Sequence, residues 1–199
     1  MVFNSTLLKN LVSIYGPTSR EDLIRKFIRN EIKDYVDDIK VDNLGNLIAH
    51  KKGNGKKIMI SAHMDQIGMM IIDIDKKGFL RFTNIGGLSV TNLIGQQVIF
   101  ENGTIGVVFH EPKDNISDIK LENMYIDIGV FSKEEAQTKV NIGDICIYKP
   151  SFEENENVVI TPYLDDRVGC LVAIEAIKSI SKPYNDLYFI FSVQEEVGL

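Results

Sequence analysis

Hydrophobic periodicity changes twice along this 199-residue chain, and this feature restricts its fold more than any other. Residues 1–66 begin with two stretches of helical spacing, and apolar runs of strand type follow them. Residues 67–158 carry short strands separated by turn residues, which is typical of a small all-β barrel or sandwich. Helical spacing and a continuous apolar run return in residues 159–199. We therefore expect an α/β domain, formed by residues 1–66 and 159–199, that is interrupted by a β insertion over residues 67–158.

The opening residues predict two amphipathic helices. Apolar side chains recur at helical spacing over residues 7–15 and again over residues 23–32. Thr18 or Ser19 is expected to cap the second helix, because a side-chain hydroxyl there can accept a free backbone N–H. Glu21 then falls in the first turn, where the helix dipole favours a negative charge.

Local turn chemistry and one apolar run predict the remaining elements. Residues 42–46, Asp-Asn-Leu-Gly-Asn, form a turn between two short strands. Asn102-Gly103 predicts a hairpin with a type I′ turn, and residues 132–135, Ser-Lys-Glu-Glu, predict the capped start of a short helix. The continuous apolar run 187–191 is typical of a central strand in a parallel sheet. The interrupted domain is therefore expected to contain a mostly parallel sheet.

Charge and composition exclude several classes of partner. The net charge is −6, and the acidic residues are spread along the chain. A nucleic-acid interface needs a basic surface, so we expect no nucleic-acid binding. No apolar run approaches the length of about 18 residues that spans a membrane, so we expect no membrane partner. Cys146 and Cys170 lie among apolar neighbours and are expected to be buried, reduced thiols, which is consistent with a cytoplasmic protein.

Three polar clusters follow apolar segments, and they are the candidate site. They are His63-Met64-Asp65, Asp165-Asp166-Arg167 and Glu195-Glu196. Ligands of open α/β sheets bind at the carboxyl ends of strands, which is where these clusters fall. One imidazole and several carboxylates suit divalent ions such as Zn²⁺, Mn²⁺ or Co²⁺. His50 and His110 lie outside the clusters and are expected to be structural.

Within each cluster a structural role competes with a chemical one. His63 and Asp65 leave the same face of a strand, so they form either a surface ion pair or a metal ligand with its orienting carboxylate. Asp165 and Asp166 are adjacent, so one can face a site while the other caps a helix. The two adjacent glutamates that follow a buried strand can bind a cation, act on a water, or lie in a solvated loop.

The three clusters, in this order around a β insertion, resemble the tetrahedral, or glutamyl and deblocking, aminopeptidase family of dinuclear metallopeptidases. The resemblance covers the whole chain. It rests on the motifs GPTSRED, VDNLGNLIA, SAHMDQIG, YIDIG with SKEEA, LDDRVGC and QEEVGL.

The resemblance implies a role for each site residue. His63 is implied as a ligand of one metal, with Asp65 orienting it. Asp165 is implied as the carboxylate that bridges two ions, with a peptide bond after it that is often cis. Glu196 is implied as a ligand of the second metal, and Glu195 as the general base. The cofactors would be two divalent ions, Zn, Co or Mn.

The resemblance also implies substrates and partners. The substrates would be peptides with a free N-terminus. The insertion would be a dimerisation domain, and the dimers would assemble into a tetrahedral dodecamer. The family pattern includes an Asp and a His ligand downstream of Glu196, and this C-terminally truncated chain contains neither. We therefore expect the 199-residue fragment alone to bind metal weakly and to be inactive.

Two other interpretations remain open. Paired acidic residues are also typical of a glycoside hydrolase of the endoglucanase type, although His63 and Asp65 have no role in that chemistry. Alternatively, the chain is a non-catalytic oligomerisation fragment with a vestigial site. Sensitivity to chelators separates the metallopeptidase from the glycosidase, and an activity assay beside sedimentation separates it from the assembly module.

Overall fold

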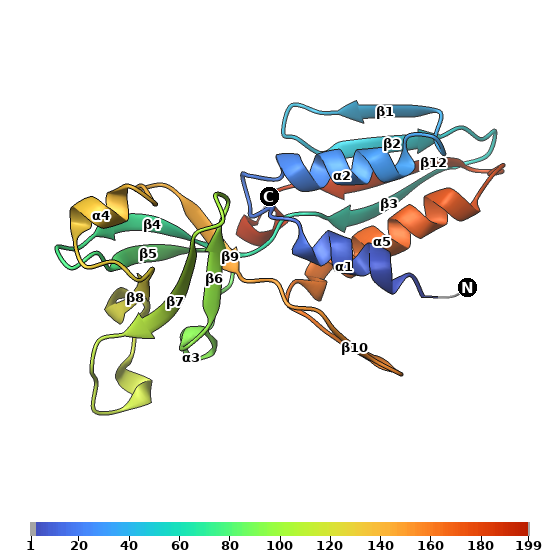
Figure 1. The fold of residues 1–199 in the computed structure, drawn as a ribbon. Helices are drawn as coiled ribbons and strands as arrows, with labels where there is room; N and C mark the ends of the chain where they lie inside the picture. Colours follow the sequence, from blue (N-terminus) through green and yellow to red (C-terminus); the bar gives the residue numbers. More distant parts are fainter. Residues whose placement is uncertain (1–2, 199) are drawn as a thin grey trace. The chain divides into compact units, whose positions relative to one another are not determined.

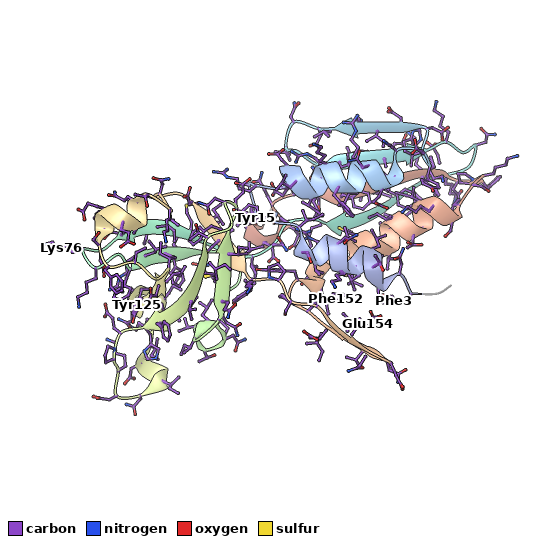
Figure 2. The ribbon with its side chains drawn as sticks, viewed as in Figure 1. Phe3, Tyr15, Lys76, Tyr125, Phe152 and Glu154 are labelled. Carbon is purple, nitrogen blue, oxygen red and sulfur yellow. The ribbon has the colours of Figure 1, made fainter. Side chains whose placement is uncertain are left out.

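The structure, a computed structural model, describes residues 3–198 and contains two compact units. One unit comprises Met1–Gln66 and Pro150–Leu199, and the other comprises Ile67–Lys149. The sequence placed the second boundary near residue 158, whereas residues 150–158 belong to the first unit. The reason is that Phe152, labelled in Figure 2, packs against the core of that unit.

The first unit is a four-stranded sheet with three helices on one face (Figure 1). Its strands lie in the order β1-β2-β12-β3, with bounds Asp38–Val41, Leu47–Lys51, Asp186–Ser192 and Lys57–His63. The helices are α1, α2 and α5, with bounds Ser5–Ser13, Asp22–Ile32 and Leu164–Ser179. A short hairpin, β10 (Glu153–Asn155) with β11 (Val158–Ile160), and the 3-10 turn η3 (Glu195–Val197) complete it.

The expectation of a mostly parallel sheet is wrong for the described residues. Only β12 and β3 run parallel, while β1–β2 and β2–β12 are antiparallel. The apolar run that suggested a central parallel strand is β12. Its alternate residues Leu187, Phe189 and Phe191 are buried under the helices, whereas Tyr188 and Ile190 are half-buried on the other face. An unbroken apolar run therefore does not require helices on both faces.

The start of α2 also differs from the expectation. Neither Thr18 nor Ser19 caps it; the N-cap position is Glu21, whose side chain makes no cap hydrogen bond. Ser19 instead has a positive φ of 73°. By contrast, the turn at 42–46 is confirmed, since the Asp42 carboxylate accepts the backbone N–H groups of Leu44, Gly45 and Asn46.

The second unit is a closed antiparallel barrel of six strands, so the expected all-β insertion is confirmed. The strand order is β4-β5-β8-β7-β6-β9. The bounds are β4 Gly68–Ile74, β5 Leu80–Ile85, β6 Gln97–Phe100, β7 Ile105–His110, β8 Met124–Asp127 and β9 Ile145–Tyr148. Short helical segments connect them: α3 Val90–Leu93, η1 Ile116–Asp118, η2 Leu121–Asn123 and α4 Lys133–Gln137.

Two local predictions for the barrel can be compared directly with the structure. The β6–β7 hairpin forms where Asn102-Gly103 predicted it, but the type I′ assignment is wrong. Only Gly103 has a positive φ, because the loop is longer and closes through the bond from the Phe100 N–H to the Thr104 carbonyl. The start of α4 is confirmed: the Ser132 hydroxyl accepts the backbone N–H of Glu135. Among residues 3–198 no helix is long and apolar enough to cross a membrane.

Candidate functional site

The parallel pair of strands brings two of the three polar clusters together. Ser192 at the end of β12 pairs with His63 at the end of β3. The chain after β12 then turns through η3, which carries Glu195 and Glu196, beside the segment after His63. Helix α5 packs against β3 and delivers the third cluster at its first turn. All the predicted site residues therefore lie in the first unit.

His63 lies at the centre of the site, and its two ring nitrogens face different carboxylates. Its Nε2 is 3.0 Å from Asp165 Oδ1 and 3.7 Å from Glu195 Oε2. Its Nδ1 is 3.3 Å from Asp65 Oδ1. A metal-binding histidine shows this division, with one nitrogen toward the ion and the other held by a carboxylate.

Asp65 is fully buried and holds three segments together. Its carboxylate faces the His63 ring, accepts the Thr18 hydroxyl at 2.7 Å, and accepts the backbone N–H groups of Glu195 and Glu196 at 3.2 and 3.3 Å. Burial alone would raise the pKa of Asp65, but the bonds from His63 and Thr18 lower it below its usual value. Asp65 is therefore a carboxylate anion inside the protein.

Asp165 and Asp166 point to different tasks. The peptide bond between them is cis, as the family resemblance implied. The Asp165 side chain is 89% exposed, and its Oδ1 approaches His63 Nε2. Asp166 Oδ1 accepts the backbone N–H of Gly169, so this carboxylate caps the regular part of α5. Asp165 is thus free to bind a ligand, and Asp166 is occupied by the helix.

The two glutamates also differ. The Glu195 carboxylate is 56% exposed and reaches toward the His63 Nε2. Burial raises the pKa of Glu196, and the neighbouring carboxylates of Asp65, Asp165 and Glu195 raise it further, although His63 lowers it. Of the two glutamates, Glu195, which the resemblance assigns as base, makes the described contact to His63, and Glu196, which it assigns as ligand, does not.

The side chains around His63 provide some of the ligands that a divalent cation needs. Several carboxylates gather around one imidazole nitrogen, and their mutual repulsion is relieved when a cation binds between them. Among residues 3–198, however, no group of three or more His, Cys, Asp or Glu side chains is arranged so that it encloses an ion. The chain thus supplies several donors of a metal site without a complete shell.

Sequence reasoning missed two residues that support the site, Thr18 and Glu21. Both were interpreted as part of the start of α2, yet both side chains are buried and turned away from that helix. Three non-glycine residues with positive φ also flank the site segments, namely Ser19, Tyr163 and Gln194. Such conformations concentrate at functional sites, but only the folded structure reveals them.

The other two histidines lie apart from the site. The His50 ring stacks on Tyr188, and its Nε2 is 2.7 Å from Asp186 at the start of β12, the opposite end of that strand from the site. His110 Nδ1 faces a backbone carbonyl in the barrel unit. Cys146 and Cys170 are free and buried, as expected.

The stability of the metal-free chain should fall between pH 6.5 and pH 9. Burial opposes protonation of His63, but Asp65, Asp165 and Glu195 outweigh it and raise its pKa to about 9. A raised pKa in the folded state stabilises the fold fully below the unfolded value near 6.5, and this stabilisation is lost as the pH rises through 9. We expect a loss of about 2 kcal/mol in the free energy of unfolding.

Urea unfolding of chelator-treated chain at several pH values measures this loss, with His63→Asn as the control. The difference between the two proteins should shrink as the pH rises from 6.5 to 9. A difference that stays constant across this range would show that His63 does not titrate as the folded geometry requires.

Comparison with known proteins adds the following. The profile of a family described as M42 glutamyl aminopeptidase matches residues 45–199. A protein of Acetivibrio thermocellus with an aminopeptidase name is 52% identical over 194 residues, and lysyl aminopeptidase of Pyrococcus furiosus is 39% identical over 206 residues. Each match covers 97% of this chain but only 59% and 60% of those relatives. The chain thus spans about three fifths of their length.

Solved structures agree with the sequence matches. Pyrococcus horikoshii TET1 peptidase, which is described as assembling into a tetrahedron or a large octahedral shell, superposes with a TM-score of 0.86 at 38% identity. That match covers 97% of this chain and 62% of the other. A Thermotoga maritima structure named as an endoglucanase gives a TM-score of 0.85 at 36% identity, covering 94% of this chain and 58% of that one.

Proposed function

Because the chain belongs to the M42 glutamyl aminopeptidase family, we propose that the protein of which it forms a part is a metal-dependent aminopeptidase. It would remove N-terminal residues from peptides. The observation that carries the proposal is the arrangement around His63, whose Nε2 faces Asp165 and Glu195 while its Nδ1 faces Asp65. These contacts bring two carboxylates close to one imidazole at the end of β3.

Each residue has a proposed task. His63, Asp165 and Glu196 would hold two divalent ions, Zn, Co or Mn. When bound, these ions would acidify a water and polarise the scissile carbonyl. Glu195, whose exposed carboxylate lies beside His63 Nε2, would take the proton of the attacking water and return it to the leaving amine. Asp65 would accept a hydrogen bond from Nδ1 of His63 and so keep Nε2 of that ring free to bind metal.

The chain would supply only part of the metal shell. His63, Asp165 and Glu196 are three candidate ligands, and the family pattern adds an Asp and a His that this chain does not contain. We propose that these come from the portion of the relatives that the chain does not match. The 199-residue chain alone would then bind metal weakly and show little peptidase activity.

We also propose that the barrel unit mediates self-association, first into dimers and then into a tetrahedral dodecamer. P. horikoshii TET1 peptidase forms such shells, and it is similar over nearly the whole chain. The barrel unit exposes large apolar side chains that a partner would cover, including Ile72, Ile105, Phe109, Phe131 and Ile142. The two buried, free thiols are compatible with the cytoplasm as the proposed compartment.

A glycoside hydrolase is the second candidate, because one similar structure carries the name endoglucanase. In a retaining glycosidase two carboxyl groups flank a sugar bond at about 5 Å. Here an imidazole lies between Asp165 and Glu195, and the buried Asp65 braces that imidazole. This arrangement gives His63 no task in glycoside cleavage, so it favours the metallopeptidase. The non-catalytic assembly module predicts no hydrolysis at all.

The test uses a chimera in which residues 1–199 replace the matched region of the A. thermocellus relative. We expect it to release N-terminal residues from unblocked peptides, to lose this activity in EDTA, and to regain it with Zn²⁺, Co²⁺ or Mn²⁺. An N-acetylated peptide of the same sequence is the control and should remain intact. Activity that survives EDTA, or hydrolysis of a β-glucan instead of peptides, would overturn the proposal.

A further inference from the structure

Arg167, in the first turn of α5, is completely buried. Burial lowers its pKa to about 10, so its guanidinium is still a cation near neutral pH. It follows two residues after Asp165, the exposed carboxylate beside His63. None of the proposed metal or catalytic roles uses Arg167. Because its side chain has no exposed surface, it acts only on its neighbours within the protein.

Arg167 binds the end of a helix that is distant along the chain. Its Nη1 donates to the backbone carbonyl oxygen of Leu11, in the last turn of α1. The carbonyl end of a helix carries a partial negative charge, and α1 has no basic residue of its own in its last turn. Helices α1 and α5 pack together in the first unit (Figure 1). Arg167 thus supplies, from α5, the cation that the end of α1 favours.

The guanidinium also packs against the loop that supports Asp65. A methyl group at position 16 would lie only 2.9 Å from Arg167 Nη2, so Gly16 leaves the space that the guanidinium occupies. The Gly16 N–H donates to Gln66 Oε1, and two residues later the Thr18 hydroxyl donates to Asp65. One buried cation therefore contacts both the end of α1 and the loop that follows it.

A second buried contact attaches the same part of α5 to β3. Cys170 lies about one turn after Arg167 and is fully buried, and its thiol donates to the backbone carbonyl oxygen of His63 at 3.2 Å. A single contact would leave the first turn of α5 free to rotate about it. Arg167 and Cys170 hold the turn at two points, and this fixes its direction as well as its distance from His63.

The direction of this turn decides where Asp165 lies. Its side chain is 89% exposed, so few packing contacts fix it, yet its Oδ1 is 3.0 Å from His63 Nε2. The backbone at Asp165 and Asp166 is not helical, with φ and ψ of −80° and 114° at the first and −115° and 38° at the second. The regular hydrogen bonds of α5 therefore do not fix Asp165, and its position depends on the contacts that anchor the residues after it.

We propose that Arg167 is a positioning residue: its guanidinium holds the first turn of α5 against the end of α1 and Gly16, so that Asp165 meets His63 Nε2. The consequence for metal binding rests on the proposed function, because it requires Asp165 to be a metal ligand. The structural part stands without that assumption. Arg167 acts through the backbone that joins it to Asp165 and would touch neither the metal nor the substrate.

Amide hydrogen exchange of the 199-residue chain tests the structural part. The probe is the Gly169 N–H, which donates to Asp166 Oδ1 and so reports whether the turn with both aspartates is ordered. Arg167→Met, an apolar side chain without charge or donors, should speed exchange at Gly169 by about tenfold and leave the last turns of α5 nearly unchanged. Arg167→Lys keeps the charge and a donor for the Leu11 carbonyl, so it should restore part of the protection.

Lys178→Met is the matched control, because Lys178 is a cation of the same helix that pairs with Glu31 of α2, at the opposite end from Asp165. It should leave exchange at Gly169 unchanged. Unaltered exchange at Gly169 in Arg167→Met would overturn the proposal. So would faster exchange that spreads equally through α1 and α5, because Arg167 would then only stabilise the fold. If Arg167→Met does not fold, Arg167→Lys decides: a rate at Gly169 equal to that of the unaltered chain would overturn the proposal.

The chimera with the A. thermocellus relative separates this proposal from the proposed function. Arg167→Met should weaken Co²⁺ binding by about tenfold or more, and excess Co²⁺ should restore most of the lost kcat, because the ligand is displaced but present. A loss of folded protein would not respond to the metal in this way. If the exchange pattern holds while the unaltered chimera cleaves no peptide, the aminopeptidase assignment fails and the structural role stands. If the chimera is active and Arg167→Met leaves its Co²⁺ affinity unchanged, the positioning role in the metal site is wrong.

Discussion

Glu195→Gln in the chimera should lower kcat for peptide cleavage by about 10²–10⁴-fold and leave the metal content unchanged. The substitution keeps the shape of the side chain but removes its ability to take a proton from water. The Glu195 carboxylate is exposed beside His63 Nε2, and its backbone N–H remains bound to Asp65 in the variant. Steady-state kinetics and metal analysis on the same samples measure the two effects separately.

Glu196→Gln is the matched variant, since it makes the same chemical change one residue later. It should reduce bound metal, because Glu196 is the proposed ligand of the second ion. The opposite pattern, with metal lost in Glu195→Gln and turnover lost in Glu196→Gln, would show that the two roles are exchanged. The described contacts make this a sharp test, because of the two glutamates it is Glu195 that contacts His63 Nε2.

Glu134→Gln serves as the background control for both variants. Glu134 lies in α4 of the barrel unit, outside the site. It should change neither kcat nor metal content. If all three variants lost activity to the same extent, the effect would reflect a general change in the protein and not the chemistry of the site.

The sequence predicted the elements that depend on local patterns. Helical spacing identified α1 and α2, turn residues identified the hairpins, and regular strand spacing identified the barrel. The three polar clusters were found because each follows an apolar segment, and the parallel pairing of β3 with β12 then brings two of them together. These features depend on short stretches of chain, so a single sequence contains enough information to predict them.

The features that were missed depend on contacts between distant segments. Thr18 and Glu21 precede a helix, and from local pattern alone they are indistinguishable from capping residues. The partner of Thr18 is Asp65, which lies 47 residues away along the chain. The relative directions of the strands were mispredicted for a similar reason. An apolar run such as β12 does not reveal which strands it pairs with.

Asp65→Ala should destabilise the 199-residue chain more than any other single change in the site, by about 3–5 kcal/mol. Three donors lose their acceptor at once, namely the Thr18 hydroxyl and the backbone N–H groups of Glu195 and Glu196, and the His63 ring loses the carboxylate 3.3 Å from its Nδ1. Removing one member of a buried charged pair also leaves the His63 imidazolium without its buried counter-charge. Urea unfolding at pH 6.5 measures the loss, because His63 is protonated there in the folded chain.

Thr18→Val is the matched control, because it removes only one of the three hydrogen bonds that Asp65 accepts and keeps the shape of the side chain. It should cost about 1 kcal/mol. If Asp65→Ala cost no more than Thr18→Val, Asp65 would be a peripheral partner of His63. A large difference between the two would instead show that one buried carboxylate ties the histidine, the loop before α2 and the turn with both glutamates into a single unit. In that case the direction of His63 and the placement of Glu195 would depend on the same side chain, and Asp65→Ala would impair metal binding and turnover together.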